Sequence, residues 1–207
     1  MEEYMIITEK MRSDQERTLN RRKQVLDAAA ACFARSGFHG ASMAEISKAA
    51  GMSAGHIYNY FASKDAIIAA FVGQNLERVA AILSDLVQQE NPLQTMFDNA
   101  ELHVRENLDP ALWALQLEIF SEASRNPTVA AALRDADTHL RGELRDILRR
   151  ARQQRQLAVD DSTIDGRVDT IIGMYQGMSL RALHNPELDV AGVVAAFRLA
   201  LAPLLFG

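Results

Sequence analysis

The stretch from Ser42 to Lys64 brings together hydroxyl, phenol, imidazole, amide and ammonium side chains. Hydroxyl, phenol and ammonium groups are suitable partners for phosphate oxygens. Imidazole and amide groups, such as those of His56 and Asn59, can donate hydrogen bonds to the edges of bases. The chemistry that this stretch predicts is recognition of nucleic acid.

A catalytic interpretation of the same side chains finds less support. His56 could act as a general base, but its neighbours Tyr58 and Asn59 complete no triad and no nucleophile is evident. The sequence has no cluster of His, Cys, Asp and Glu at metal-ligand spacing and no glycine-rich phosphate loop; the other histidines considered, His39, His139 and His184, are isolated. We therefore expect that the protein is not an enzyme and that it has no cofactor and no metal site.

Local signals predict how this stretch folds. Ser42 can cap a first helix, and Glu45 follows at the spacing of a capping box. Gly51 comes after the last helical residue, where glycine adopts the left-handed conformation at low cost. Ser53 then caps a second helix of about two turns, and Ser63 caps a third that starts at Lys64. Two short helices joined by a glycine turn form a helix-turn-helix, whose second helix enters the DNA major groove.

The charge distribution fits contact with phosphate at one end only. The chain has 207 residues and a formal net charge of -5. Residues 17–64 hold seven Lys and Arg against two acidic residues, a balance of +5, whereas residues 65–207 hold thirteen basic and twenty acidic residues, a balance of -7. A basic head on an acidic body is the pattern expected of a protein that binds nucleic acid through its head.

Composition also bounds the compartment. Cys32 is the only cysteine, which excludes an internal disulfide, and its place in an apolar helix favours a buried structural thiol over a redox sensor. The first residues contain no long apolar run, and no uninterrupted apolar segment approaches the ~18 residues of a membrane span. We expect a cytoplasmic protein without a membrane partner.

The periodicity of the whole chain predicts an all-α fold of nine helices. Residues 1–16 carry mixed charge and are expected to form a flexible arm, residues 17–63 the helix-turn-helix domain, and residues 64–207 a second helical domain for effector binding and dimerisation. Four prolines preceded by Asn or Asp predict helix starts. The predicted helices are 17–36, the two of the motif, 64–89, 92–107, 110–125, 127–156, 162–184 and 186–205. The arginines at the end of 127–156, Arg145, Arg149, Arg150, Arg152 and Arg155, are expected to be solvated and to complement the helix dipole.

The last two predicted helices are the most apolar and predict a homodimer. Gly173 and Gly177, four residues apart, allow another helix to approach closely. A twofold partner that presents the same pair would form a four-helix interface. The predicted interface residues are Ile172, Gly173, Gly177, Val193, Val194, Phe197 and Leu201. The alternative is that both helices belong to the core of a single chain.

Residues from about Arg21 to Phe71, a quarter of the chain, resemble the N-terminal domain of the TetR/AcrR family of bacterial transcriptional regulators. The matching stretches are VLDAAAACFARSGFHGAS and MAEISKAAGMSAGHIYNYFASKDAII, and the run from Gly51 to Lys64 is the most characteristic.

The resemblance implies a homodimer through the last two helices and a ligand cavity in the C-terminal domain. It places Ser42, Ser53, Tyr58, Tyr60 and Lys64 near the DNA backbone, and Ala54, Gly55, His56 and Asn59 at the exposed positions of the recognition helix. With Met43 and the basic residues Arg21 and Arg22, these form the predicted DNA-binding set. Ile57 and Phe61 are expected to face the core.

A ligand cavity needs apolar walls with a few placed polar groups. The predicted effector pocket consists of Met96, Phe97, His103, Trp113, Gln116, Leu117, Phe120, Met174, Tyr175 and Met178. The hypothesis is a repressor that releases a near-palindromic operator when an apolar or amphipathic molecule binds. The alternatives are a module of the same fold that is controlled by a protein partner, and an activator.

Overall fold

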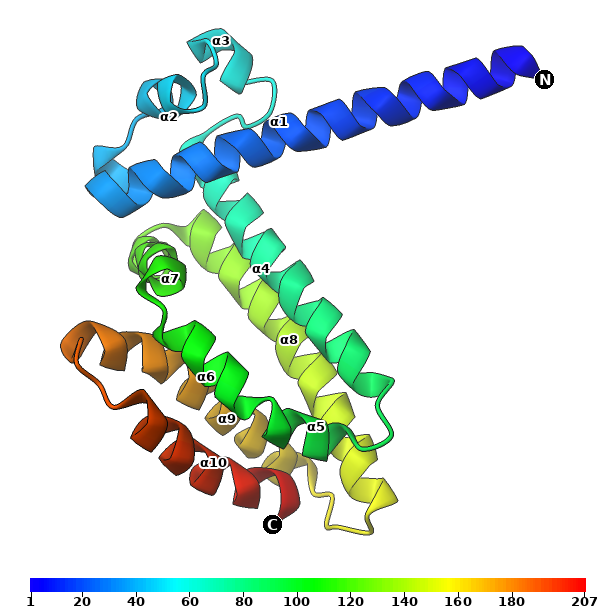
Figure 1. Cartoon of the computed structure of the whole chain (residues 1–207), viewed down its shortest axis with the longest axis vertical. Helices are drawn as coiled ribbons and strands as arrows, with labels where there is room; N and C mark the ends of the chain where they lie inside the picture. Colours follow the sequence, from blue (N-terminus) through cyan, green and yellow to red (C-terminus); the bar gives the residue numbers. More distant parts are fainter. The chain divides into compact units, whose positions relative to one another are not determined.

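The all-α prediction is confirmed by a computed structural model of the chain, which describes residues 1–207 except the side chains of 2–11 and 111–113. The part that the structure describes forms ten helices (Figure 1). They are α1 Glu2–Gly40, α2 Met43–Ala49, α3 Ala54–Ile57, α4 Lys64–Val87, α5 Pro92–Asp98, α6 Ala100–Leu108, α7 Pro110–Ala123, α8 Pro127–Gln154, α9 Asp161–His184 and α10 Val190–Phe206.

The chain divides into two compact units. The N-terminal unit comprises Met1–Phe71 and Leu117–Ala130, and the C-terminal unit comprises Val72–Gln116 and Ala131–Gly207. The segment 117–130 holds the end of α7 and the start of α8, so helices α4, α7 and α8 each have residues in both units. No pattern in the sequence indicated that 117–130 would join the N-terminal unit.

The N-terminal unit is built on local signals that the sequence displays. Gly37, with φ +67°, interrupts the helical backbone of α1 directly after residue 36, the predicted end of the first helix. Ser42 and Glu45 form the predicted capping box at the start of α2. Gly51 has φ +63°, and the Ser53 side chain accepts a hydrogen bond from the His56 backbone. The helix after Ser53 is shorter than predicted, because Tyr58–Tyr60 form a turn instead of a second helical turn.

The core of the N-terminal unit draws on all of its helices. Phe33 of α1 is buried and packs against Phe38 and Phe71, with ring centroids 5.5 and 6.3 Å apart. Ile46 of α2 and Ile57 of α3 are fully buried. Burying such side chains stabilises the unit by about 1.5–3 kcal/mol each. The predicted arm lies mostly on residues 2–11, outside the described side chains, whereas residues 12–16 are helical and exposed.

The C-terminal unit has its own core, in which α6 packs against α9 and α10, and α10 against α5. The predicted helix 92–107 is divided at Asn99 into α5 and α6, since the Asn99 N–H turns back to the carbonyls of Thr95 and Phe97. The predicted start at Asn185–Pro186 is wrong: α10 begins at Val190, where the Asp189 carboxylate accepts a hydrogen bond from Ala191 N. The cap of α9 is Asp160, so α9 begins at Asp161, one residue before the predicted start at 162.

Arginines join the C-terminal helices in a way that the sequence did not indicate. Arg141 pairs with Asp169 at 2.6 Å, and Arg145 with Asp165 at 3.0 Å, so α8 and α9 are linked by ion pairs. Arg152 is only 2% exposed and donates to the carbonyls of Ala158 and Leu205. The prediction of a solvated Arg152 is therefore wrong, because this guanidinium binds the carbonyl of Ala158, between α8 and α9, and that of Leu205, at the end of α10.

Helix α4 is, among the described residues, the one helix long and apolar enough to cross a membrane by length and composition. Its first turns are part of the core of the N-terminal unit, where Ile67 and Ile68 are buried. Glu77 and Arg78 interrupt its middle, and the side chain of Arg78 bonds to Asn75. Some of the apolar side chains of α4 thus pack against other helices of this chain.

Candidate nucleic-acid interface and effector region

Helix α3 separates its side chains sharply between core and surface. Ile57 is fully buried and Phe61 is 3% exposed, as predicted. The other residues of this stretch form a continuous exposed surface of small and polar side chains; they are Ser53, Ala54, Gly55, His56, Tyr58 and Asn59. Two buried anchors therefore fix which face of the helix is presented to a partner.

Gly55 leaves the middle of this surface flat. A Cβ atom at Gly55 would meet no atom within 4 Å, so packing inside the chain does not require glycine there. Glycine costs about 1 kcal/mol of helix propensity relative to alanine. A surface without a side chain at this point lets a partner approach the backbone closely, as contact with the floor of a DNA groove requires.

His56 and Tyr60 form a pair. The Tyr60 hydroxyl lies 3.2 Å from His56 Nε2, and the two rings are 5.4 Å apart. This contact orients the imidazole and uses one of its two nitrogens. The remaining nitrogen, Nδ1, is the one available for a base edge, whereas the Tyr60 hydroxyl keeps an acceptor or donor position for a phosphate.

Side chains of helix α1 donate hydrogen bonds to backbone carbonyls beside α2 and α3. The Arg22 guanidinium donates to the carbonyl of Tyr60 at 2.8 Å and lies 4.4 Å above the Phe61 ring. Gln24 donates to the carbonyl of Ala50 at 2.7 Å, next to the glycine turn. Arg22 therefore has a structural role that the sequence did not reveal. Arg21 is exposed and bonds to the Gln24 side chain, so its charge remains at the surface.

Lys64 is also bound within the chain. Its ammonium group donates to the carbonyls of Phe38 at 2.7 Å and Ala41 at 2.8 Å, and it lies 4.5 Å from the centre of the Phe38 ring. Lys64 thus fastens the start of α4 to the corner between α1 and α2. Its predicted contact with DNA would use the one remaining N–H of the ammonium group.

Ser42 is the N-cap of α2, and Met43 is its first residue. Ser42 is exposed, but its hydroxyl is engaged with Glu45, to which it donates at 3.0 Å. The hydrogen bonds from the Ser42 backbone and hydroxyl lower the pKa of Glu45 below its ordinary value. Met43 is half-buried. These residues position α2 and leave part of their surface open.

The predicted effector residues fall into three groups. Six lie in the C-terminal unit, where the rings of His103 and Tyr175 are 6.3 Å apart and the others lie partly buried against the core; these are Met96, Phe97, His103, Met174, Tyr175 and Met178. Gln116 is half-buried in the same unit, whereas Leu117 and Phe120 belong to the N-terminal unit. Trp113 lies outside the described residues.

Polar groups accompany the six C-terminal residues. His103 Nδ1 lies 3.1 Å from Glu106, and Arg78 approaches the same carboxylate at 3.8 Å. Burial raises the pKa of Tyr175 to about 12, so its hydroxyl stays protonated at neutral pH. Methionines with a few placed polar groups are the composition expected of a pliable ligand site.

A groove of about 420 Å³ also opens on the C-terminal unit, and of the predicted pocket residues only Phe97 lines it. The sequence analysis missed its charged residues, Glu101, Arg105 and Arg198. Arg105 pairs with Glu101 at 2.8 Å, and Arg198 lies 4.6 Å above the Phe97 ring. Among the side chains that the structure describes, no group of three His, Cys, Asp or Glu residues is placed to hold a metal ion.

Sequence comparison assigns both parts of the chain. Residues 25–71 match "Bacterial regulatory proteins, tetR family", and residues 98–205 match "BetI-type transcriptional repressor, C-terminal". The HTH-type transcriptional regulator UidR of Escherichia coli K12 is 32% identical over 142 residues, which cover 69% of this chain and 71% of UidR. The chain belongs to the TetR family of bacterial regulators. It is thus a DNA-binding transcriptional regulator, and the relatives that it matches are regulators rather than enzymes.

Solved structures share the fold of this regulator. Salmonella enterica GusR superposes with a TM-score of 0.72 at 28% identity, over 90% of this chain and 96% of GusR. Bacillus subtilis FadR in complex with stearoyl-CoA superposes with a TM-score of 0.69 at 21% identity, over 89% of this chain and 98% of that one. At this identity the likeness to FadR concerns the fold alone.

The regulator's predicted dimer residues divide into exposed and buried ones. Gly173 is exposed, and Ile172, Gly177 and Val193 are half-buried. The other three, Val194, Phe197 and Leu201, are at most 7% exposed and belong to the core of the same chain. These three lie on the side of α10 that packs against α5, α6 and α9 within the chain, so the predicted interface residues that remain at the surface are Ile172, Gly173, Gly177 and Val193. Apolar character in the sequence could not distinguish the two sides of α10.

Proposed function

We propose that this TetR-family regulator is a homodimeric, cytoplasmic repressor that releases a palindromic operator when an apolar or amphipathic small molecule binds its C-terminal unit. The observation that carries the proposal is the exposed, flat and polar face of α3, held by Ile57 and Phe61 from below. Of the predicted DNA-binding residues, those from Ser53 to Tyr60 lie on this face or in the turns beside it. The others lie on the neighbouring helices, with Arg21 and Arg22 on α1, Ser42 and Met43 at the start of α2, and Lys64 at the start of α4. Two copies about one DNA turn apart would contact two half-sites.

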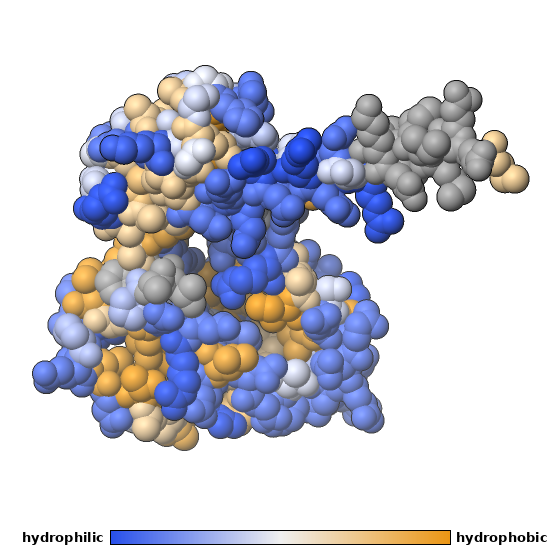
Figure 2. Space-filling view, turned by 45° about the horizontal axis from the view of Figure 1, so that its top comes forward, coloured by the Kyte–Doolittle hydropathy of each residue, from blue (hydrophilic) through white to orange (hydrophobic). Residues whose placement is uncertain are grey.

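The dimer is supported by the outer faces of α9 and α10. Gly173 and Gly177 continue along α9 to Leu180, which is 47% exposed, and α10 presents Leu199, which is 78% exposed. A Cβ atom at Gly173 or Gly177 would meet nothing within 4 Å. Figure 2 shows apolar side chains at the surface of the C-terminal unit. Glycines that lower helix propensity without serving packing in their own chain favour a helix from a partner at this face.

The effector is supported by the six residues that gather in the C-terminal unit. Met96, Met174 and Met178 give an adaptable apolar wall, and His103 and Tyr175 add polar groups. FadR, which has the same fold, was solved with stearoyl-CoA bound. A ligand that binds one conformation more tightly than the other shifts the population, and only this difference in affinity can lower the affinity for DNA.

The experiment is selection of random duplex DNA by the purified protein, followed by mobility-shift titration of the selected sequence. The expected result is a palindromic duplex that binds two chains and is released by a compound from an apolar and amphipathic library. A ligand that binds tightly and leaves the affinity for DNA unchanged would contradict the effector part. Enrichment of a non-palindromic site bound by one chain would contradict the dimer.

A further inference from the structure

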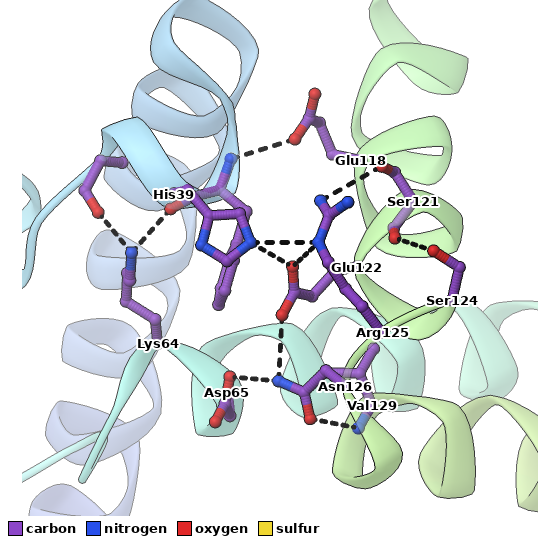
Figure 3. A network of polar contacts seen from close by, with 12 residues as sticks. His39, Lys64, Asp65, Glu118, Ser121, Glu122, Ser124, Arg125, Asn126 and Val129 are labelled. Atoms are coloured by element: carbon purple, nitrogen blue, oxygen red, sulfur yellow. Dashed lines mark hydrogen bonds and ion pairs between the residues drawn. The ribbon is translucent and has the colours of Figure 1, made fainter.

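The segment 117–130 contacts the residues that flank the helix-turn-helix, although it is covered by the match to the C-terminal family region, 98–205. It consists of the last turns of α7, the connection to α8 and the first turn of α8. Its contacts are concentrated on residues 37–41, the corner between α1 and α2, and on the start of α4 (Figure 3). A change in α7 therefore reaches the N-terminal unit directly.

Three acidic or amide side chains of the segment make these contacts, and Arg125 adds a fourth one, with its Nε 3.2 Å from His39 Nε2. Glu118 accepts a hydrogen bond from the Phe38 backbone N–H at 3.0 Å. Glu122 Oε2 lies 2.9 Å from His39 Nε2. Asn126 donates to Asp65 and to Glu122, both at 3.0 Å. We call these three residues, with Phe38, His39 and Asp65, the Glu122 latch.

Glu122 is the centre of the latch. It is 3% exposed, and Arg125 approaches the same oxygen as His39 at 3.3 Å. Burial alone would raise the pKa of Glu122, but the hydrogen bond from Asn126 and the charges of His39 and Arg125 outweigh it and hold the pKa below its ordinary value. A buried carboxylate that stays ionised needs its partners in place, which makes the arrangement sensitive to the loss of any one of them.

The corner held by the latch determines where α2 begins. Gly37 has φ +67°, and the Lys64 ammonium binds the carbonyls of Phe38 and Ala41. The corner is thus fixed by α4 through Lys64 and by α7 through Glu118 and Glu122. Ser42, the cap of α2, follows immediately, so the position of α2 and α3 depends on both attachments.

We infer that the Glu122 latch sets the position of the helix-turn-helix for DNA binding, and that α7 acts through it on α2 and α3 in addition to the connection through α4. This rests on the proposed function in that the signal to be passed is the binding of an effector. Glu122 is a positioning residue: it contacts the corner and not the DNA. Releasing the latch changes how well two recognition helices match two half-sites.

The test uses the full-length protein with His39→Ala and Glu122→Ala. His39 is 65% exposed, so its substitution removes the contact to the corner with little risk to folding, and it leaves Glu122 with Arg125 and Asn126. The control is His139→Ala, since His139 is exposed on α8 and bonds to the Asp135 carbonyl in its own helix. Circular dichroism and sedimentation verify that each variant is folded and has the wild-type oligomeric state.

The readout is affinity for palindromic duplexes whose half-sites are moved apart or together one base pair at a time. The wild type and His139→Ala should have a sharp optimum. His39→Ala and Glu122→Ala should lose about 10-fold in affinity at the optimum and little at other spacings, which flattens the profile. The double variant should lose no more than Glu122→Ala alone, because both changes open the same contact.

A second measurement is independent of DNA. Amide hydrogen exchange of Phe38 and the first turn of α2 should be at least about 10-fold faster in Glu122→Ala than in the wild type. Wild-type exchange there, or a wild-type spacing profile in both variants, would overturn the latch. A wild type that selects no DNA would contradict the proposed function, and the exchange result would still decide the latch. An operator that no compound releases would contradict only the effector part.

Discussion

The two contact regions of this regulator are constructed in opposite ways. Around α2 and α3, side chains from other helices bind backbone carbonyls: Arg22 binds Tyr60, Gln24 binds Ala50 and Lys64 binds Phe38 and Ala41. The outer faces of α9 and α10 include glycines and exposed leucines, and the side chains that bind backbone carbonyls of α10, Arg152 and Arg167, do so only at its C-terminal end.

This difference fits the contact that we propose for each region. Helices of four and seven residues have too few hydrogen bonds to be stable alone, so they need external anchors to present a defined surface to DNA. Helices of 24 and 17 residues are anchored by their own buried sides, and their outer sides can be left small for a second chain. The first region needs a fixed position of α2 and α3, whereas the second needs a surface that a partner helix can approach closely.

The largest effect should come from filling the glycine surface of α9. Gly177→Leu places a large side chain where a partner helix would approach, and we expect the dimer to dissociate about 100-fold more readily in sedimentation equilibrium. The matched control is Gly142→Leu, because Gly142 is exposed on α8 and a Cβ there also meets nothing within 4 Å. Equal dimer stability in both variants would mean that α9 does not form the interface.

Removing an anchor of the other region should cost stability instead. Lys64→Met keeps most of the aliphatic side chain but loses two hydrogen bonds from a charged donor to backbone carbonyls, and we expect a loss of about 2–3 kcal/mol in the free energy of unfolding. Denaturant melts followed by circular dichroism measure it. Lys48→Met, at an exposed position of α2, should change the free energy by less than about 0.5 kcal/mol. If the two variants melt alike, Lys64 does not hold the corner.

Alkaline pH should affect the C-terminal unit through Tyr175. Its pKa is raised to about 12 by burial, whereas the unfolded side chain ionises near 10. The stabilising contribution is complete below about pH 10 and is lost as the pH rises through 12, since the unfolded chain releases the proton first. Urea melts between pH 8 and 12 should show a loss of up to about 2 kcal/mol. Tyr175→Phe should remove this part of the slope; an unchanged slope would refute the assignment.

The smallest effects concern individual side chains that face DNA. Arg21→Ala should weaken binding to all sequences and lower the slope of log Kd against log salt by about 2 for the dimer, because one phosphate fewer is neutralised in each of the two half-sites. His56→Ala should instead change which base is preferred at one position of each half-site. Mobility-shift titrations over a salt series and a set of mutated operators separate the two. A uniform loss over all operators for His56→Ala would remove it from the base-reading set.

The regions also differ in how far the sequence predicted them. The capping box of Ser42 and Glu45 and the left-handed Gly51 depend on residues a few positions apart, so local reasoning located them correctly. The buried side of α10 depends on which helices pack against it. Val194, Phe197 and Leu201 are as apolar as an interface requires, and only the tertiary structure assigns them to the core.

Long-range polar contacts were the least predictable. Arg22 and Lys64 are of the residue types that bind phosphate, yet both bind backbone carbonyl oxygens far away in the sequence. Arg22 binds a carbonyl 38 residues away, and Lys64 binds carbonyls 26 and 23 residues away. Asp189 and Asn185 are both suitable helix caps by residue type. The cap of α10 is Asp189 and not Asn185, and residue type alone could not distinguish them. Arg152 similarly binds the carbonyl of Leu205, 53 residues along the chain. Residue type limited the chemistry in each case, but not the partner.

The membership of 117–130 in the N-terminal unit has a practical consequence for building hybrid regulators. Exchanging the sensory portion of one family member for that of another at the end of the helix-turn-helix would also replace Glu118, Glu122 and Asn126. A chimera joined only near Phe71 would carry a foreign set of residues against its own His39 and Asp65. A graft that retains 117–130 from the DNA-binding parent keeps both sides of that contact compatible.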